Sequence, residues 1–397
     1  MMNTKRILVT NATVYAEEKI IDKGYVLIEN GKISDVGSTQ SLPRFHDDIE
    51  LVELDESYKL VPGFIDLHIH GAAGADTMDA TLQALKTMAK ILPQEGTTSF
   101  LATTMTTSPE DIEKALKNAA NYIQHENSFG EAELLGVHLE GPFISPKRAG
   151  AQHPGHIIAP DIELFKKWQE IAAGSIRLVT LAPEQENGLK LTKYLRDSGV
   201  VASIGHSDAT YKEVVAAIAA GITHATHLFN GMRGIHHREP GVAGAVLMHD
   251  EVKCEMIADG IHVGPEMVRF AYRNKGPDGI VLITDAMRAK CLGAGTYDLG
   301  GQEVTVDGER AILKDGTLAG SILKLKDAIK NMMSFTGCSL EDIIRMAAWN
   351  PAKQLQLLDR KGSIEKGKDA DLVVLNEEYD VVMTFCRGKL AYSKWEV

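Results

Sequence analysis

The stretch VPGFIDLHIHGAAGADTMDA, residues 61–80, decides how the rest of the sequence is interpreted. Its first half is predicted to be a buried β-strand, because it is mostly apolar and is bounded by Gly63 and Gly71. Two imidazoles interrupt this apolar run, at His68 and His70. Side chains two positions apart on a strand point the same way, so both histidines are expected on one face of the strand.

The histidine pair by itself leaves two interpretations open. A single histidine in a strand is more often a hydrogen-bonded core residue than a metal ligand. Two histidines on one face make metal binding as plausible as packing. The residues at the ends of the other predicted strands decide between metal binding and core packing.

The middle of the chain alternates short apolar strands with amphipathic helices, which predicts an α/β fold. Helices are expected over 78–94, 108–124 and 161–173, with Ser108 as an N-cap before Pro109. A (β/α)8 TIM barrel accounts for eight such strands better than an open doubly wound sheet. No GxGxxG or P-loop motif supports a nucleotide cofactor. The predicted strands are 63–71, 99–104, 134–141, 177–183, 201–207, 224–230, 254–260 and 279–286.

Both ends of the chain are rich in β-strand residues. Residues 5–37 contain an Asn30-Gly31 turn between apolar runs, and residues 368–393 have the same texture. We therefore expect a small β-sandwich domain formed by the N- and C-terminal segments. The predicted domain bounds are 1–60 with 361–397 for this β-sandwich, and 61–360 for the barrel.

Composition restricts the partners of the protein. The 397 residues carry 42 Lys and Arg against 54 Asp and Glu, a net charge of −12. This balance argues against a nucleic-acid or anionic-membrane surface, but one local arginine can still bind an anionic small molecule. The four cysteines form no CxxC motif, and no signal-like or spanning apolar run appears. A cytoplasmic enzyme with free thiols is expected.

Histidines and carboxylates occur at the carboxyl ends of most predicted strands. Active sites of TIM barrels lie at this end, so these side chains should converge. Several imidazoles with two carboxylates, Glu140 and Asp285, indicate a divalent metal, most favourably zinc or iron, with manganese or cobalt as alternatives. His224 should face away from His227, and His262 could polarise a substrate carbonyl or cap a loop. The strand-end residues are His68, His70, His138, Glu140, His206, His227, Asp259 and Asp285.

Nine strings, in order along the barrel, resemble the N-acetylglucosamine-6-phosphate deacetylase family of the amidohydrolase superfamily. Together they are far more specific than any single string. The β-rich ends also resemble the small split β domain of that family. The strings are PGFIDLHIHG, TTSFLATTMTT, GVHLEGPFISPKRAGAQ, SIGHSDA, THLFNGM, HHREPG, IADGIHV, LITDAM and DGTLAGS.

The resemblance implies roles for individual residues. Metal ligands are implied at His68, His70, Glu140, His206, His227 and Asp285, for one or two ions per chain, with Glu140 where many amidohydrolases carry a carboxylated lysine. Asp285 matches the catalytic acid/base, and His262 is the second catalytic candidate. Substrate contacts are implied at Ala151, Gln152, Asn230, Gly231, Arg238, His262, Leu318, Ala319 and Gly320.

The resemblance also implies an activity and a partner. The reaction would be hydrolysis of the acetamide of N-acetyl-D-glucosamine 6-phosphate, in amino-sugar catabolism and cell-wall sugar recycling. Arg238 would bind the phosphate, and a homodimer is expected, with Arg273 as a candidate contribution from the second subunit. An amidohydrolase for the galacto isomer or a cyclic amide is the alternative. A metal-free scaffold protein is disfavoured because every ligand-type residue is present.

Overall fold

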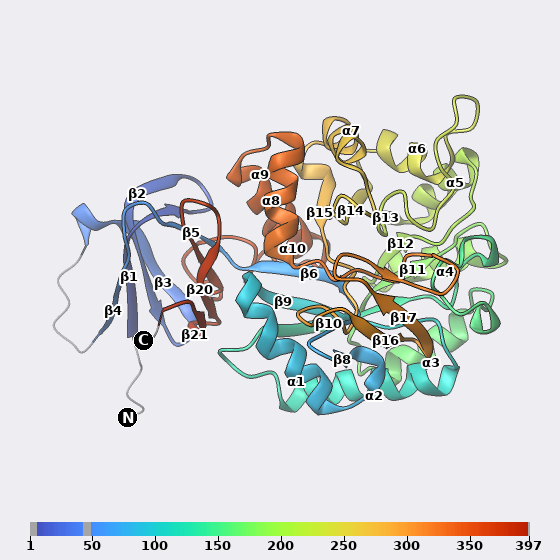
Figure 1. Ribbon diagram of the computed structural model, residues 1–397, viewed down its shortest axis with the longest axis horizontal. Helices are drawn as coiled ribbons and strands as arrows, with labels where there is room; N and C mark the ends of the chain where they lie inside the picture. The colour runs from blue at the N-terminus through green and yellow to red at the C-terminus, as the bar shows by residue number, and fades with distance from the viewer. Residues whose placement is uncertain (1–5, 43–48, 396–397) are drawn as a thin grey trace.

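The computed structural model describes residues 6–42 and 49–395, and it shows a β-rich part beside an α/β part (Figure 1). In the β-rich part, segments from both ends of the chain share one sheet in the order β21-β20-β19-β5-β1-β2-β3, with β4 paired to β1. The two chain ends meet where β19 pairs antiparallel with β5. The strands are β1 (Arg6–Tyr15), β2 (Ile20–Glu29), β3 (Lys32–Ser38), β4 (Glu50–Glu53), β5 (Lys59–Pro62), β19 (Leu372–Leu375), β20 (Val381–Cys386) and β21 (Lys389–Ser393).

Most of the buried apolar residues of this sheet form one cluster, and Leu8, Tyr25 and Leu27 form a second, smaller one. Val9 and Val26 from the N-terminal strands lie in the same buried cluster as Leu372 and Phe385 from the C-terminal strands. The predicted sandwich is thus one continuous sheet wrapped around a shared core. The predicted domain limits at residues 1 and 397, and Lys5 of the first predicted strand segment, lie outside the described residues.

All eight predicted barrel strands form, and they are parallel neighbours in chain order. The first and last strands close the ring through their continuing backbones: Asp285 N donates to His68 O at 2.8 Å, and His70 N donates to Ala286 O at 2.9 Å. This confirms the predicted (β/α)8 architecture. The strands are β6 (Phe64–Ile69), β9 (Thr97–Thr103), β10 (Glu133–Glu140), β11 (Ile176–Leu181), β12 (Val201–Ile204), β13 (Ile222–Ala225), β14 (Lys253–Met256) and β15 (Ile280–Leu282).

Helices surround the barrel, and the three predicted from sequence are present. The Ser108 side chain accepts from Asp111 N at 3.2 Å, which gives α2 its predicted N-cap. Of the described residues, none belongs to a helix that could cross a membrane. The helices are α1 (Leu82–Ile91), α2 (Pro109–His125), α3 (Ile162–Ile171), α4 (Gly188–Asp197), α5 (Tyr211–Ala220), α6 (Gly241–Met248), α7 (Pro265–Lys275), α8 (Leu325–Thr336), α9 (Leu340–Ile344) and α10 (Asn350–Gln354).

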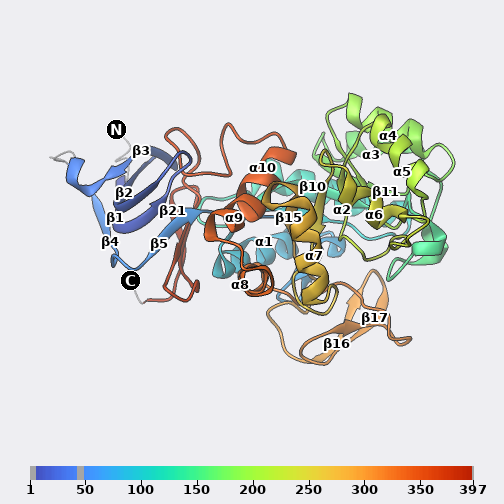
Figure 2. The ribbon, with the colours of Figure 1, turned by 90° about the horizontal axis from the view of Figure 1, so that it is seen from above.

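A small antiparallel sheet between β15 and α8 was not predicted. It consists of β16 (Gly295–Leu299), β17 (Gln302–Val306) and β18 (Ala311–Ile312), and it projects from the side of the barrel (Figure 2). Gln302 Nε2 donates to the carbonyl oxygen of Ala151 at 2.5 Å, which ties the sheet to the loop after β10. This sheet thereby contributes one wall of the cavity described next.

Candidate metal centre

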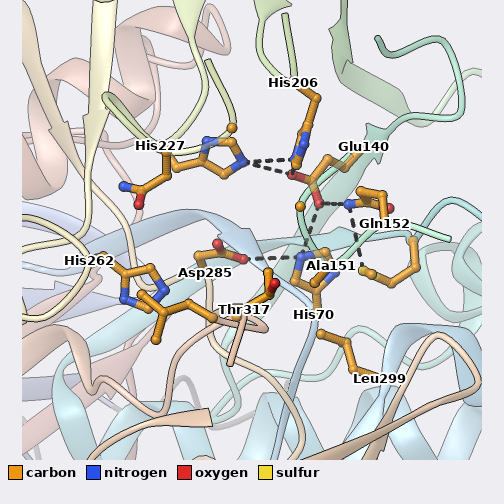
Figure 3. Close-up of a pocket in the computed structure, with 16 residues that line it drawn as sticks. His70, Glu140, Ala151, Gln152, His206, His227, His262, Asp285, Leu299 and Thr317 are labelled. Carbon is orange, nitrogen blue, oxygen red and sulfur yellow. Dashed lines mark hydrogen bonds and ion pairs between the residues drawn. The ribbon is translucent and has the colours of Figure 1, made fainter. Parts of the chain in front are cut away.

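Three predicted site residues follow barrel strands and share an unusual backbone conformation. His206, His227 and Asp285 come after β12, β13 and β15 with φ angles of 47°, 31° and 48°. Residues other than glycine seldom adopt this left-handed region, and such strain persists where surrounding bonds fix it. The Asp285 backbone is fixed by its donation to His68 O and by donation from Ser321 N at 2.7 Å. All three side chains face one cavity at the barrel mouth (Figure 3).

Glu140, the last residue of β10, lies at the centre of the cluster (Figure 3). Its Oε1 atom is 3.2 Å from both His206 Nε2 and His227 Nε2. Its Oε2 atom is 3.2 Å from His70 Nε2 and 3.5 Å from His68 Nε2. One carboxylate therefore faces two groups of imidazoles, one with each oxygen.

The group formed by Glu140, His206 and His227 fits a metal ion. His206 Nδ1 lies 2.8 Å from the carbonyl oxygen of Arg148, so Nδ1 carries the proton and Nε2 presents a lone pair. That lone pair faces His227 Nε2 at 3.0 Å. A tetrahedral zinc ion with bonds of about 2.0–2.1 Å holds its ligand atoms about 3.3 Å apart, close to the spacing found here.

The second group joins His68 and His70 to Asp285. Both Nε2 atoms lie near Asp285 Oδ1, at 3.3 and 3.2 Å. Glu255 Oε2 lies 2.9 Å from His68 Nδ1, so the proton sits between those two atoms and His68 Nε2 presents a lone pair. That buried Nε2 atom has no hydrogen-bond partner among the described residues. A cation between these ligands would satisfy it.

The buried carboxylates demand positive charge. Burial acts to lower the pKa of His70, but hydrogen bonds to Asp285 and Glu140 outweigh it and raise that pKa to about 9. Burial acts to raise the pKa of Asp285, yet the charge of His68 and the hydrogen bond from His70 lower it overall. Burial also acts to raise the pKa of Glu140, but the charge of His68 and the hydrogen bond from His206 lower it overall. Both carboxylates therefore favour the ionised form, and protons on the imidazoles or a metal ion would supply the compensating positive charge.

His262 faces the same cavity from the loop after β14. Its Nδ1 atom is 2.6 Å from Asp259 Oδ2, and the other oxygen of Asp259 accepts from the backbone of Ile261 and His262. Burial acts to lower the pKa of His262, but the hydrogen bond and charge of Asp259 raise it overall. The shift favours the imidazolium form, in which Nε2 carries a proton that it can donate to a ligand in the cavity.

The cavity has a volume of about 270 Å³ and collects most of the predicted residues. The predicted residues that line it are His70, Glu140, Ala151, Gln152, His206, His227, Asn230, Gly231, His262, Asp285, Leu318 and Gly320. His68 lies beneath them, fully buried. Gln152 is held rather than free: its Nε2 donates to Glu140 at 2.9 Å and its Oε1 accepts from Thr106 N at 2.7 Å.

Two predicted substrate contacts do not reach the cavity. Arg238 is exposed on the loop between β13 and α6, where its guanidinium contacts His237 Nε2 at 2.8 Å. Ala319 is buried in the core beneath the small sheet, and its backbone N donates to Ala311 O at 2.9 Å. The neighbouring positions Leu318 and Gly320 face the cavity instead, because the chain alternates sides there.

Several residues of the site were missed in the sequence. Glu255 is fully buried and contacts His68, yet it stands alone in an apolar strand and belongs to no recognised motif. The clue in the sequence was one carboxylate within an apolar strand, because a buried carboxylate needs hydrogen-bond partners. His224 was predicted to face away from His227. It does not line the cavity, and it contacts Glu255. The unpredicted lining residues are Met105, Gly150, Leu299 and Thr317.

Comparison with known proteins identifies the family of the chain. A family model described as the amidohydrolase family matches residues 60–391. The chain therefore belongs to the amidohydrolase family. That family is generally metal-dependent, and the structure holds a cluster of potential metal ligands.

The relatives are more specific than the family. The chain is 49% identical to the N-acetylglucosamine-6-phosphate deacetylase of Bacillus subtilis, with 98% of each protein covered. It superposes with a TM-score of 0.90 and 32% identity on a mutant of the Mycobacterium smegmatis deacetylase in complex with N-acetyl-D-glucosamine-6-phosphate, covering 98% of this chain and 100% of that one. An N-acetylgalactosamine-6-phosphate deacetylase of Escherichia coli O157:H7 is 38% identical, over 84% of this chain and 87% of the relative. These relatives confirm the resemblance identified in the sequence motifs.

The two ligand groups predict how many ions bind. Metal-free protein titrated with zinc should take up two ions per chain, because each oxygen of Glu140 faces a separate set of nitrogen atoms. The variant His70→Asn should take up about one, since only the second group is damaged. Elemental analysis after gel filtration measures both values. His249→Asn, at a surface histidine that lies outside both groups, should retain two. A wild-type value of one would show that the β6 pair holds no ion.

Proposed function

We propose that this chain hydrolyses the acetamide of N-acetyl-D-glucosamine 6-phosphate to D-glucosamine 6-phosphate and acetate. The observation that carries the proposal is the convergence of Asp285, His262 and the two ligand groups on one cavity, in a chain whose relatives are deacetylases. The carboxylate of Asp285 and the hydrogen-bond donor His262 then face the same substrate cavity. That combination suits water attack on an amide carbonyl.

The metal ligands in this proposal are His68, His70, Glu140, His206, His227 and Asp285, for one or two ions. When bound, a divalent metal makes water acidic and polarises a carbonyl oxygen. Neutral imidazoles and carboxylates suit zinc or iron, and also manganese or cobalt, so cellular supply helps decide the metal.

The chain's own residues carry the proton transfers. Asp285 takes a proton from the attacking water and then delivers it to the leaving amine, so the first step prepares the second. His262, held by Asp259, donates from Nε2 to the carbonyl oxygen as negative charge develops there. Gln152 keeps Glu140 in place through its 2.9 Å hydrogen bond. Ala151, Asn230, Gly231, Leu318 and Gly320 shape the sugar-binding wall.

Recognition of the phosphate is assigned to Arg238, because guanidinium binds phosphate oxygens in a bidentate manner. Its side chain is exposed, so binding would require the loop that carries it to close over the cavity. We further propose a homodimer. Met267, Phe270 and Arg273 recur every three residues on α7 and share an exposed face, where Arg273 could reach a neighbouring subunit. A cytoplasmic role in amino-sugar catabolism and cell-wall sugar recycling is proposed on the same relatives.

Release of acetate tests the proposed reaction. The wild-type enzyme with metal should release acetate from N-acetylglucosamine 6-phosphate far faster than from N-acetylglucosamine, because the phosphate supplies binding energy that the neutral sugar lacks. N-acetylgalactosamine 6-phosphate serves as the matched epimer. Equal rates with and without the phosphate would refute the phosphosugar assignment. Preference for the galacto epimer would support the alternative suggested by the 38% identical relative.

Removal of the proposed acid/base should slow the chemical step. Asp285→Asn retains the size of the side chain but cannot take up the proton, so kcat should fall by at least about 10²-fold. The zinc content should be measured alongside, because Asp285 also belongs to the second ligand group. Normal turnover at full metal content would remove Asp285 from this role.

The pair His262–Asp259 predicts a pH dependence. The pKa of His262 is raised, so activity that needs its imidazolium is complete below that pKa and is lost as the pH rises through it. Asp259→Asn removes the hydrogen bond and charge that raise the pKa, and should move the basic limb of kcat/KM to lower pH by about one unit. Asp278→Asn, at a surface aspartate paired with Arg345, is the control and should leave the profile in place. An unshifted limb in Asp259→Asn would mean that another group sets it.

A further inference from the structure

Glu255 is a fully buried carboxylate that the proposed reaction does not use. It lies on β14 and accepts hydrogen bonds from three different positions. The donors are His68 Nδ1 at 2.9 Å, His224 Nε2 at 3.1 Å and the backbone N of His227 at 3.0 Å. Burying a carboxylate is costly unless hydrogen bonds replace its water, and three N–H donors do so here.

The direction of these hydrogen bonds follows from Gln354, which contacts His224 on the side away from Glu255. Gln354 Nε2 donates to Thr223 O at 3.2 Å and to His224 Nδ1 at 2.9 Å. His224 Nδ1 therefore accepts, and its Nε2 carries the proton that goes to Glu255. An ionised Glu255 can only accept, so the proton it shares with His68 Nδ1 belongs to the histidine. The lone pair of His68 is thereby placed on Nε2, towards Asp285 and Glu140.

The same carboxylate fixes a residue of the other ligand group. Glu255 Oε2 accepts both from the His68 ring and from the backbone N of His227. His227 has a left-handed backbone with φ of 31°, a conformation that needs such support. His68 and His227 face different oxygens of Glu140. One buried oxygen atom thus holds a ligand from each side of the centre.

We infer that Glu255 is a positioning residue that orients His68 and His227 together, and so sets the metal affinity of both ligand groups at once. The inference rests on the proposed metal centre. Carboxylates that hold the outer nitrogen of a ligating histidine fix its ring and increase its basicity, and their loss lowers metal affinity or activity about 10–100-fold. Loss of Glu255 should lower the metal affinity of both ligand groups, because its Oε2 atom contacts one histidine from each group.

A third metal ion bound by Glu255 itself is the competing explanation. His68, His138 and Glu255 lie close enough to form a potential ligand group. However, the nitrogen that His68 would offer is Nδ1, which already bonds to Glu255, and His138 Nε2 is 2.7 Å from Thr180 Oγ1. Nδ1 of His68 and Nε2 of His138 therefore already have hydrogen-bond partners within the protein. Orientation of the ligands is therefore the better account.

Zinc affinity of the full-length protein without substrate tests the inference. Glu255→Gln keeps an acceptor for His68 and His227 but removes the negative charge. Its dissociation constants for both zinc ions, measured against a chromophoric chelator, should rise about 10–100-fold. Excess zinc should restore much of kcat with little change in KM. Unchanged zinc affinity, or loss confined to one ion, would overturn the shared role. A third zinc ion in the wild type that Glu255→Gln lacks would establish the competing explanation.

The matched control is another buried glutamate. Glu95 is 3% exposed and pairs with Lys290 at 2.5 Å, outside the ligand groups. Glu95→Gln should lower the melting temperature of the metal-free protein without weakening zinc binding. Equal weakening in both variants would show a general effect of lost buried charge, and would refute the inference.

A shorter side chain provides the second test. Glu255→Asp keeps the charge but draws the carboxylate away from the imidazoles, so zinc affinity should fall while the charge is retained. Wild-type affinity in this variant would overturn the inference even if Glu255→Gln does not fold. Because the zinc-affinity measurements contain no substrate, absence of acetate release by the wild type would refute the proposed function and leave the affinity result standing.

Discussion

The site depends on one carboxylate placed between two sets of nitrogen atoms. Glu140 presents Oε1 to His206 and His227, and Oε2 to His68 and His70, at 3.2–3.5 Å. Such an arrangement is unfavourable in a buried space unless positive charge lies between the groups. The surrounding structure imposes it nevertheless, through left-handed strand ends, the Arg148 carbonyl and Glu255. The buried ligand cluster therefore lowers the stability of the fold, and a bound cation would offset that loss.

Much of this centre could be predicted because it obeys short-range rules. His68 and His70 share a face because strands repeat every two residues. Glu140 and Asp285 could be placed because parallel strands end on one side of a barrel. Ser108 and Pro109 predicted the start of α2. The β-rich segments at the two ends of the chain predicted a shared domain, and they do share a sheet.

The remaining features depend on contacts between distant parts of the chain. Glu255 lies 187 positions from His68, and one glutamate in an apolar strand carries no mark of its partners. Gln152 lines the cavity, and its amide contacts Glu140 and the backbone of Thr106, which lie 12 and 46 positions away. The strands β16–β18 are short and turn-rich, and the cavity wall they form follows from packing against Met105 and Met287. No local periodicity encodes these arrangements.

The hydrogen bonds that close the barrel have a further consequence. The strand that carries His68 and the segment that carries Asp285 are joined by the backbone bond from Asp285 N to His68 O. His68 and Asp285, two members of the second ligand group, therefore lie on either side of the junction between the first and last strands. The second ligand group thus depends on the meeting of these two strands, whereas Glu140, His206 and His227 follow strands within the ring. A change that separated the first and last strands would therefore divide the second ligand group and leave the strands of the first group paired.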